Sequence, residues 1–451
     1  MPTQPIVGVT PGGLQATLEF ATHLPTMPRP FRPIALLALL ALLAACGKDK
    51  PPGLASVDAH PDGYWQDTRF PQGTGILDET TRRKLERLAN LGYSDGVEPA
   101  RPVTGVTRWE VERSQPGLNL YCSGHGPEAI LMDMAGEVLH RWHLPFEAVP
   151  SKRTPDLRTQ LTWRKVHLFD NGDLLACYEG LGLVRIDSES RMLWYWDGAA
   201  HHDFEVRDGR VYTLAREPRY LPYLRNPSGV VEDWVCVLDA TTGREIERHS
   251  LYQALFESPW SATLVLRSET ASDVLHTNSI EAVGEDLAPR IPGARPEDWL
   301  LVFRDIHALA ILAASDGRIV WYEEGPWKGP HSASPTPKGN VLLFDNMGQD
   351  GFTRLLEWDP IGDQIAWQYH GSPPESFVSI FSGNVHWLAN GNRLTAVSCA
   401  GYAQELTPSG EVVWEFQSPH RAGKAQELVA VLFDMERLDP GQVAGWLNRR
   451  K

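Results

Sequence analysis

Cysteine, positive charge and long hydrophobic runs are all scarce in this chain. It has 5 cysteines among 451 residues and no Cys-x-x-Cys pair, so zinc ribbons, zinc fingers and small disulfide-dense folds are excluded. The 42 Lys and Arg residues are outnumbered by 57 Asp and Glu, and the resulting charge of −15 argues against a protein that coats nucleic acid. A Gly-rich phosphate-binding loop is also missing, so a nucleotide cofactor is not expected.

The longest apolar run, residues 34–45, follows Arg29 and Arg32 and stops at Cys46. It is too short to cross about 30 Å of hydrocarbon as a helix. A basic flank, a short apolar segment and small residues at its end are typical of a secretory signal. Residues 1–45 are therefore predicted to be a signal region.

The end of this run resembles the bacterial lipobox. Leu-Ala-Ala precedes Cys46, and the resemblance makes this cysteine the site of lipidation and the new N-terminus. Acyl chains on the cysteine would hold the protein on a membrane. By the rule for such lipoproteins, Gly47 implies sorting to the periplasmic face of the outer membrane. Met27 fits the true start of translation better than Met1, because residues 1–26 match no signal.

Residues 46–100 are predicted to be a lipid-anchored tether with one short helix. The first part is rich in Pro, Gly and Asp, as expected of a linker. Leu85, Leu88 and Leu91 then form one apolar stripe with the spacing of a helix, and Gly92 is a suitable end for it.

Gly, Pro and Trp are plentiful in the rest of the chain. The 39 Gly, 35 Pro and 16 Trp residues favour short strands joined by many turns. A unit of turn, strand, turn and strand recurs roughly every 45 to 55 residues, with Asn-Gly or Asp-Gly type turns that suit hairpins. Val-His-Leu-Phe-Asp-Asn-Gly at 166–172, for example, resembles Val-His-Trp-Leu-Ala-Asn-Gly at 385–391. Such a repeat is typical of the blades of a β-propeller.

The sequence therefore predicts an all-β fold. A six-bladed β-propeller is expected over residues 101–420, preceded by the short helix and tether. Residues 421–451 are expected to form a C-terminal tail that packs on the propeller. The predicted blades, with a long insertion between the third and the fourth, are 118–145, 160–200, 201–250, 274–325, 330–370 and 380–417. Tryptophans of the outer strands are expected to pack between neighbouring blades, namely Trp142, Trp196, Trp321, Trp367 and Trp414. Buried free thiols are the favoured interpretation of Cys122, Cys177, Cys236 and Cys399.

Histidines and an arginine recur where the predicted blades begin. A propeller directs its inner strands toward one central channel, so polar residues at equivalent positions of the repeat converge there. The residues concerned are His202, His276, Arg304, His307, His331 and His386. Each alone is typical of an ordinary core or surface position, but together they indicate a site on the axis.

Four motifs in this region occur in an order that resembles one enzyme family. They are His-His-Asp at 201–203, His-Thr-Asn-Ser-Ile at 276–280, Arg304 ahead of Asp-Gly-Arg-Ile-Val-Trp at 316–321, and His331 ahead of Gly-Asn-Val-Leu-Leu-Phe-Asp-Asn at 339–346. The ordered series, within residues 160–420, is similar to that of the bacterial aryl sulfate sulfotransferases.

This resemblance implies transfer of a sulfuryl group from an aryl sulfate donor to a phenolic acceptor, without the nucleotide sulfate donor. The nucleophile that carries the sulfuryl group in the family corresponds to His331. Its sulfate-binding and acid/base residues correspond to His202, His276 and Arg304, and Asn278 would be an extra hydrogen-bond donor to the substrate. The resemblance implies no metal and no cofactor. The partners would be small aryl sulfates and phenols, besides the membrane.

The residue types suit this chemistry. Sulfuryl transfer, like phosphoryl transfer, passes through a loose transition state with charge on the oxygens. A neutral imidazole is a good nucleophile near pH 7, and a protonated imidazole can give its proton to the departing phenolate. A guanidinium offers a planar pair of donors to the sulfuryl oxygens.

Two other functions stay open from the residues alone. A non-catalytic lipoprotein propeller that serves as a protein-interaction platform would have side chains that do not converge on the axis. A metal- or quinone-dependent oxidoreductase would recruit carboxylates or thiolates beside the histidines. The identity of the natural phenols is open too. Whether the protein forms a homodimer is also open, because the N-terminal β-sandwich domain of well-known family members has no counterpart between Cys46 and the first blade.

Overall fold

The computed structural model describes residues 98–153, 161–224, 226, 229–348 and 350–447. The predicted signal region, the predicted lipidation site Cys46 and the predicted helix ahead of Gly92 lie outside these residues. Among the residues described, no helix is both long enough and apolar enough to cross a membrane.

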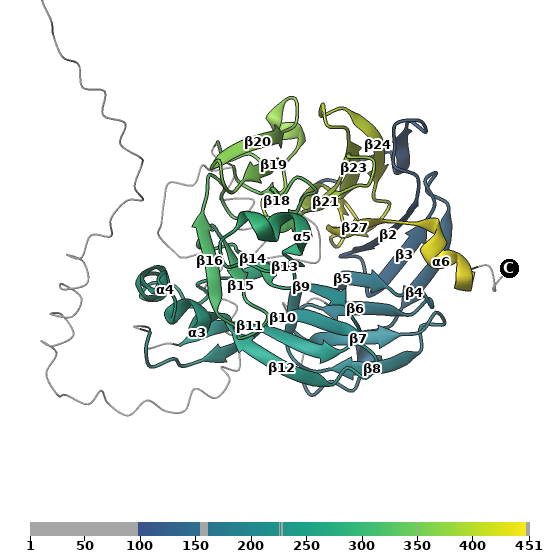
Figure 1. Cartoon of the computed structure of the whole chain (residues 1–451). Coiled ribbons are helices and arrows are strands. Elements are labelled where there is room, and N and C mark those ends of the chain that lie inside the picture. The colour runs from purple at the N-terminus through teal and green to yellow at the C-terminus, as the bar shows by residue number, and fades with distance from the viewer. Residues whose placement is uncertain (1–97, 154–160, 225, 227–228, 349, 448–451) are drawn as a thin grey trace, which may run out of the picture. The chain divides into compact units, whose positions relative to one another are not determined.

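Six antiparallel sheets are arranged around a common centre, and each contains four strands of one blade (Figure 1). From the innermost strand outward, blade 1 contains β27 (Leu432–Leu438), β2 (Leu118–Ser123), β3 (Glu128–Met132) and β4 (Val138–His143), and blade 2 contains β5 (Trp163–Leu168), β6 (Leu174–Tyr178), β7 (Gly182–Ile186) and β8 (Met192–Trp196). Blade 3 contains β9 (Ala200–Arg207), β10 (Arg210–Arg219), β11 (Val230–Asp239) and β12 (Glu245–Ser250), and blade 4 contains β13 (Thr277–Ala282), β14 (Trp299–Phe303), β15 (Ala308–Leu312) and β16 (Ile319–Glu324). Blade 5 contains β17 (His331–Pro335), β18 (Val341–Asp345), β19 (Arg354–Asp359) and β20 (Gln364–Tyr369), and blade 6 contains β21 (Asn384–Trp387), β22 (Arg393–Val397), β23 (Tyr402–Leu406) and β24 (Val412–Gln417). The predicted six-bladed propeller is confirmed.

Both ends of the described chain help to close the ring. Strand β1 (Gly105–Trp109) adds a fifth strand to the outer edge of blade 6, and β27 is the inner strand of blade 1. The predicted end of the propeller at residue 420 is therefore too early, because the segment treated as a packed tail supplies a core strand. The repeat pattern missed β27 because its partner β2 lies more than 300 residues earlier in the chain, so no hairpin turn marks it.

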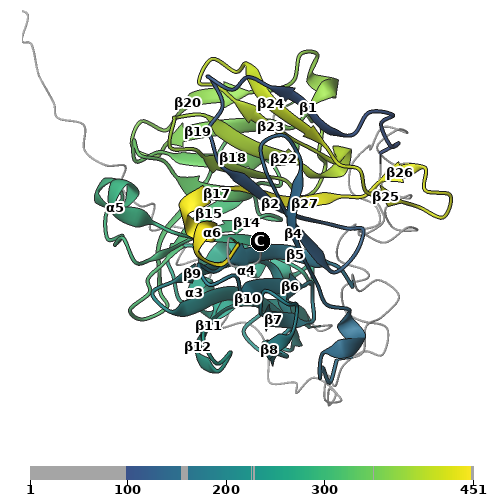
Figure 2. The same ribbon diagram turned by 90° about the vertical axis from the view of Figure 1, so that its right-hand side faces the viewer.

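The rest of the C-terminal segment forms two small elements. A two-stranded hairpin of β25 (Arg421–Ala422) and β26 (Leu428–Val429) precedes β27 and projects from the ring (Figure 2). Helix α6 (Pro440–Leu447) follows β27 and buries Val443 and Trp446. Trp446 packs on the Asn-Gly turn between β5 and β6, where Gly172 has a φ of 91° and a side chain would collide with the indole ring.

The predicted tryptophans do join neighbouring blades. Indole N–H groups donate to backbone carbonyls in the turns of the next blade, from Trp142 to Gly172 (3.1 Å), from Trp367 to Pro408 (2.9 Å) and from Trp414 to Met134 (3.0 Å). Trp196 donates to the carboxylate of Glu245 at 3.1 Å, and the ring of Trp321 lies 6.1 Å from that of Trp358. These residues therefore combine apolar burial with a directed contact between blades.

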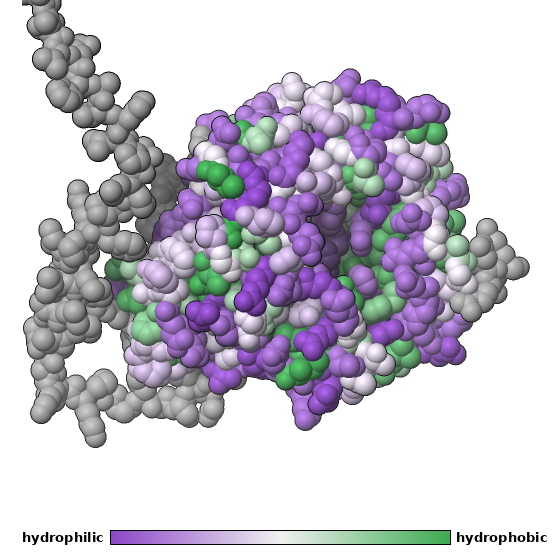
Figure 3. Space-filling view, viewed as in Figure 1, coloured by the Kyte–Doolittle hydropathy of each residue, from purple (hydrophilic) through white to green (hydrophobic). Residues whose placement is uncertain are grey.

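The insertion between blades 3 and 4 folds into helices α3 (Leu251–Phe256) and α4 (Ser261–Ser268), which share a hydrophobic core with both blades. A shorter helix, α5 (Gly284–Leu287), lies within blade 4 between its first two strands. The four cysteines of the described chain are buried free thiols, as expected. Viewed as in Figure 1, the surface is largely hydrophilic, with a recess near its middle (Figure 3).

Replacing Trp142 with Phe should cost about 1–3 kcal/mol of unfolding free energy, because the carbonyl of the buried Gly172 loses its donor. The matched control is Trp367→Phe, whose acceptor Pro408 is exposed and can bond to water instead. The control should cost less than about 1 kcal/mol. Chemical denaturation of the two variants checks this; equal losses would contradict it.

Candidate active site

The four side chains expected on the axis do lie together. His202 is on β9, His276 immediately precedes β13, His331 begins β17, and Arg304 follows β14. The ring of His202 is 5.0 Å from that of His276 and 6.5 Å from that of His331, between ring centres. Nη1 of Arg304 is 3.2 Å from Nε2 of His276. Three separate blades thus contribute to one cluster.

Irregular backbone at the start of the inner strands turns these side chains toward one another. His202 and His276 have φ values of 59° and 48°, a left-handed conformation that is uncommon outside glycine. Strand register shifts at the same places, around His202 in β9 and around Asn278 in β13. Bulges of this kind re-aim side chains and are frequent beside active sites.

His331 has a defined tautomer. The amide nitrogen of Asn346 donates to the carbonyls of Ser379 and Ser382, each at 2.7 Å, so its oxygen must face the imidazole. That oxygen is 2.6 Å from Nδ1 of His331, which therefore carries the proton and donates it. Nε2 is unprotonated, and its lone pair accepts the backbone N–H of Ser382 at 3.3 Å.

The surroundings of His331 keep it uncharged. The side chain is 4% exposed, and burial, followed by the positive charges of Arg304 and Arg164, lowers its pKa to about 3. Asn346 offers a neutral acceptor and adds no negative charge. At neutral pH, His331 is therefore a neutral imidazole with Nε2 as a base or nucleophile.

A carboxylate holds each of the other two histidines. Oδ2 of Asp273 is 2.7 Å from Nδ1 of His276, which leaves Nε2 to accept from Arg304. Oε1 of Glu179 is 3.1 Å from Nδ1 of His202, and Oε2 accepts the backbone N–H of His202 at 2.7 Å. Burial opposes ionisation of Glu179, but the neighbouring His202 and two guanidinium groups hold its pKa well below the usual range.

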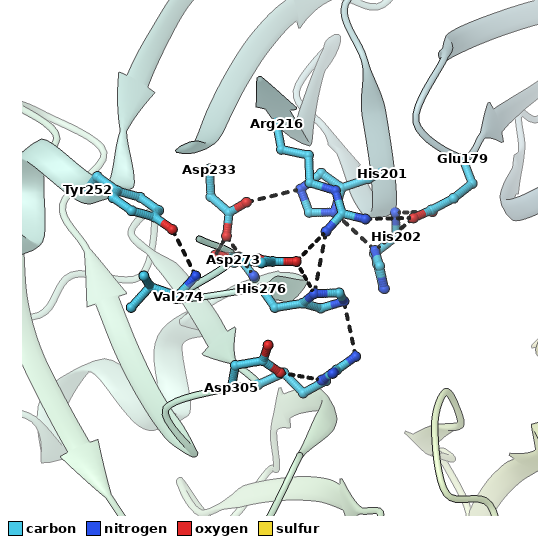
Figure 4. Close-up of polar contacts among 12 residues, drawn as sticks. Glu179, His201, His202, Arg216, Asp233, Tyr252, Asp273, Val274, His276 and Asp305 are labelled. Carbon is cyan, nitrogen blue, oxygen red and sulfur yellow. Dashed lines mark hydrogen bonds and ion pairs between the residues drawn. The ribbon is translucent and has the colours of Figure 1, made fainter. Parts of the chain in front are cut away.

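Arg216 connects the two carboxylates (Figure 4). Its Nη1 is 3.3 Å from Oδ2 of Asp273, and its Nη2 is 3.5 Å from Oε1 of Glu179. The side chain is only 1% exposed. A guanidinium buried between two carboxylates compensates their charge and fixes their positions at the same time.

A further acidic residue lies behind this layer. Asp233 is fully buried and accepts the backbone N–H and the hydroxyl of Thr277 at 2.8 and 2.7 Å. Its other oxygen is 3.8 Å from Nε2 of His201. Burial, with the charge of Asp273 adding to it, raises the pKa of Asp233 to about 7.

Other residues considered from the sequence have supporting contacts. The amide nitrogen of Asn278 donates to the carbonyl of Pro330 at 2.9 Å, and so holds the loop immediately before His331. Nδ1 of His307 lies 3.0 Å from the carbonyl oxygen of Arg304 and 3.1 Å from the backbone nitrogen of Gly329. These contacts join the loop that carries Arg304 to the loop that carries His331. His386 instead contacts Asp434, with 3.4 Å between Nε2 and Oδ1.

Two groups in the described chain have donor atoms within 4.8 Å of one another, close enough to suit a metal: Glu179 with His201 and His202, and Asp273 with His276 and Asp305. Guanidinium groups already contact their carboxylates, since Arg216 bridges Glu179 and Asp273 and Arg304 lies 2.7 Å from Asp305. A cation added here would be repelled by these charges. The arrangement favours an anionic ligand beside Arg304.

Sequence reasoning missed the partners that orient the histidines. Glu179, Arg216 and Asp233 lie in or after strands without any distinctive motif. Asp273 precedes His276 by three residues, and Asn346 ends the last of the four motifs, so these two had a local signal.

Fold and site together define a class of protein: a β-propeller with a buried set of histidines, arginines and carboxylates on its axis. A family model described as arylsulfotransferase (ASST) matches residues 165–419, more than half of the sequence, and the chain belongs to this family. It is an aryl sulfate sulfotransferase, and the family implies aryl sulfate substrates. The resemblance seen in the motifs is confirmed.

Other comparisons are more distant. No curated protein matches the sequence. Among solved structures, the chain is similar to a protein of unknown function from Bacteroides caccae, with 12% identity, a TM-score of 0.47 and coverage of 71% of this chain and 98% of that one. It is also similar to virginiamycin B lyase from Staphylococcus aureus, with 11% identity, a TM-score of 0.37 and coverage of 71% and 90%.

The free energy of unfolding should depend on acidic pH because His331 is buried and neutral. Its pKa is about 3 in the folded protein against an ordinary 6.5, so below pH 6.5 the unfolded chain binds a proton that the folded one does not. The stability that this histidine adds is complete above pH 6.5 and is lost as the pH falls toward 3.

The free energy of unfolding of the wild type should therefore fall more steeply than that of His331→Gln between pH 5.5 and 4, by about 1.4 kcal/mol per pH unit. Urea denaturation across this range measures the difference. His143→Gln, which removes an exposed histidine, should behave like the wild type. Equal slopes for wild type and His331→Gln would contradict the prediction.

Proposed function

We propose that His331 carries the sulfuryl group from an aryl sulfate to a phenol as a sulfohistidine. The observation that carries this proposal is the hydrogen bond from Nδ1 of His331 to Asn346, in a site that keeps the imidazole neutral. It leaves Nε2 unprotonated, so the attack on sulfur replaces the long hydrogen bond from the N–H of Ser382, and neutral imidazole nitrogen is a good attacking group.

In the first step, Nε2 of His331 attacks sulfur, an N–S bond forms, and the bond from sulfur to the aryl oxygen breaks. Arg304 binds the sulfuryl oxygens, where negative charge is concentrated, and His276 positions its guanidinium. Arg304 is suited to this because Asp305 and His276 hold its guanidinium in place, at 2.7 and 3.2 Å.

His202 is the proposed proton donor to the departing phenolate. Burial lowers the pKa of His202 well below its usual range, and the carboxylate of Glu179, 3.1 Å from its Nδ1, opposes this by favouring the charged form. Binding of an anionic sulfate nearby favours the same protonated form. After the phenol leaves, His202 is neutral.

The second step is the reverse reaction with a new phenol. His202 takes the proton from the acceptor hydroxyl, the oxygen attacks sulfur, and the N–S bond to His331 breaks. The products are a new aryl sulfate and the starting form of both histidines. The convergence of side chains from blades 3, 4 and 5 supports this function over a non-catalytic interaction platform.

An assay with p-nitrophenyl sulfate and a phenol acceptor tests the mechanism. We expect acceptor-stimulated release of p-nitrophenol by the wild type, and a loss of roughly 10³-fold or more in both His331→Ala and His331→Asn. The control His386→Asn changes a histidine on the inner strand of blade 6 and should retain activity.

Mass spectrometry of the wild type after exposure to donor alone should add the mass of one SO3 group, located at His331. Turnover retained by both His331 variants would remove this residue from its role. Failure of the wild type to release p-nitrophenol with any phenol would favour the platform function instead.

We also propose that the protein is a lipoprotein of the cell envelope, on the periplasmic face of the outer membrane. The support is the signal-like run before Cys46, and an envelope location suits an enzyme that needs no cytoplasmic nucleotide donor.

Expression in a bacterium fed labelled palmitate should label the wild type and the control Cys236→Ala, but not Cys46→Ser. The reason is that acylation requires the thiol at the new N-terminus, whereas Cys236 is buried. Incorporation of label into Cys46→Ser would contradict this proposal.

A further inference from the structure

His202 has a second histidine behind it, which the mechanism above does not use. This residue is His201, the first of the His-His-Asp motif. Nδ1 of His201 is 3.0 Å from Nδ1 of His202, and the planes of the two rings are nearly perpendicular, at 82°. His201 is completely buried, so it acts on a substrate through His202 and not by direct contact.

The other nitrogen of His201 faces Asp233 (Figure 4). Nε2 of His201 is 3.8 Å from Oδ1 of Asp233, and both side chains are fully buried. Neither atom has a hydrogen-bond partner in the described part of the chain, although buried polar atoms rarely remain unpaired. The gap is too narrow for a bridging water, so a movement of about 1 Å that brings the two atoms together is the direct way to satisfy both.

The contacts of Asp233 determine which of its oxygens carries a proton. Oδ2 accepts both the backbone N–H and the hydroxyl of Thr277, at 2.8 and 2.7 Å. Two hydrogen bonds occupy both lone pairs of this oxygen, so a proton on the carboxyl group lies on Oδ1, toward His201. Burial and the charge of Asp273 raise the pKa of Asp233 to about 7, and the guanidinium of Arg216 opposes them. Near neutral pH, Asp233 can therefore hold a proton for His201.

The two histidines themselves are poor places to store this proton. Burial lowers the pKa of His201 and of His202 well below the usual range. For the first of them, Arg216 adds to this, while the carboxylates of Glu179 and Asp273 oppose it. Both rings are therefore neutral in the empty site at pH 7. His202 then needs a proton from elsewhere when a phenolate departs.

We propose that Asp233 and His201 form a proton relay behind His202, which supplies the proton that His202 gives to the departing phenolate. The proposal deepens the proposed function and rests on it for the role of His202. In the first step, Oδ1 of Asp233 gives its proton to Nε2 of His201, whose Nδ1 gives its own proton to Nδ1 of His202. Nε2 of His202 gives its proton to the phenolate oxygen. Asp233 is then a carboxylate, and both imidazoles are neutral.

The second step runs through the same bonds in reverse. The acceptor hydroxyl gives its proton to Nε2 of His202, and the proton on Nδ1 of that ring returns to Nδ1 of His201. Nε2 of His201 then returns a proton to Oδ1 of Asp233. Each imidazole changes its tautomer but ends each step neutral, so burial does not oppose the overall transfer.

Donors whose leaving groups differ in basicity test the relay. A weakly basic p-nitrophenolate departs with little help from a proton, whereas unsubstituted phenolate requires it. We expect Asp233→Asn to lower kcat/KM for phenyl sulfate by about 10²-fold or more, and that for p-nitrophenyl sulfate by about threefold at most. The amide can still accept from Thr277 through its oxygen, but its NH2 group does not release a proton to His201.

Two further variants separate the relay from packing. His201→Asn keeps a polar group near Nδ1 of His202 but removes the link to Asp233, so the same selective loss is expected. The matched control is Tyr252→Phe, which disturbs the same buried layer, since the hydroxyl of Tyr252 accepts the backbone N–H of Val274 at 3.0 Å. This control should leave the ratio of kcat/KM for the two donors as in the wild type.

The pH profile gives a readout that a structural role would not change. The relay requires protonated Asp233, so kcat/KM of the wild type for phenyl sulfate should fall as the pH rises through about 7. Asp233→Asn should lack this fall, because its amide does not titrate. With p-nitrophenyl sulfate the fall should be absent from the wild type as well.

Equal losses for both donors in Asp233→Asn and His201→Asn would overturn the proposal, and so would unchanged turnover of phenyl sulfate. A selective loss in Tyr252→Phe would also overturn it, because disturbance of the layer would then be sufficient. If one of the two relay variants does not fold, as judged by circular dichroism, the other decides. Failure of the sulfohistidine mechanism is recognised separately, by turnover that survives in His331→Asn.

Discussion

The buried guanidinium of Arg216 is the contact on which the rest of the site depends. Removing a charge from water is expensive unless partners compensate it, and Arg216 stands between the carboxylates of Glu179 and Asp273. Without it, two neighbouring acids would be buried with less compensation and one would tend to take up a proton. Both carboxylates accept hydrogen bonds from the histidines, so Arg216 indirectly determines which nitrogen of each ring faces the substrate. A structural ion network thereby becomes part of the chemistry.

The three histidines have different partners, and the difference matches their proposed roles. His202 and His276 face carboxylates, whereas His331 faces the neutral amide of Asn346. A carboxylate favours the imidazolium form and so opposes burial, which lowers the pKa of His202 well below its usual range. An amide fixes the tautomer without adding negative charge, so burial and the nearby arginines keep His331 neutral. Histidine can thus act as the nucleophile at one position and as the acid at another position a few ångströms away.

The propeller supplies the rigid frame that this arrangement requires. The inner strands β9, β13 and β17 each have a local break in register beside a histidine of the site, and outer strands are joined to the next blade through tryptophan. Closure of the ring by β27 places Phe433 beside Arg164. A site assembled from several blades therefore depends on contacts between residues that are hundreds of positions apart.

Much could be inferred from the amino-acid sequence alone. Glycine-containing turns and spaced tryptophans indicated a six-bladed propeller, because hairpins are local structures and their signals lie within a few residues. His202, His276, Arg304 and His331 stood out because each lies in a short motif. Only the tertiary structure identified Glu179, Arg216 and Asp233 as their partners and β27 as the closing strand. Hydrogen bonds and ion pairs between distant blades leave no local pattern, since burial and distance are decided by how the whole ring closes.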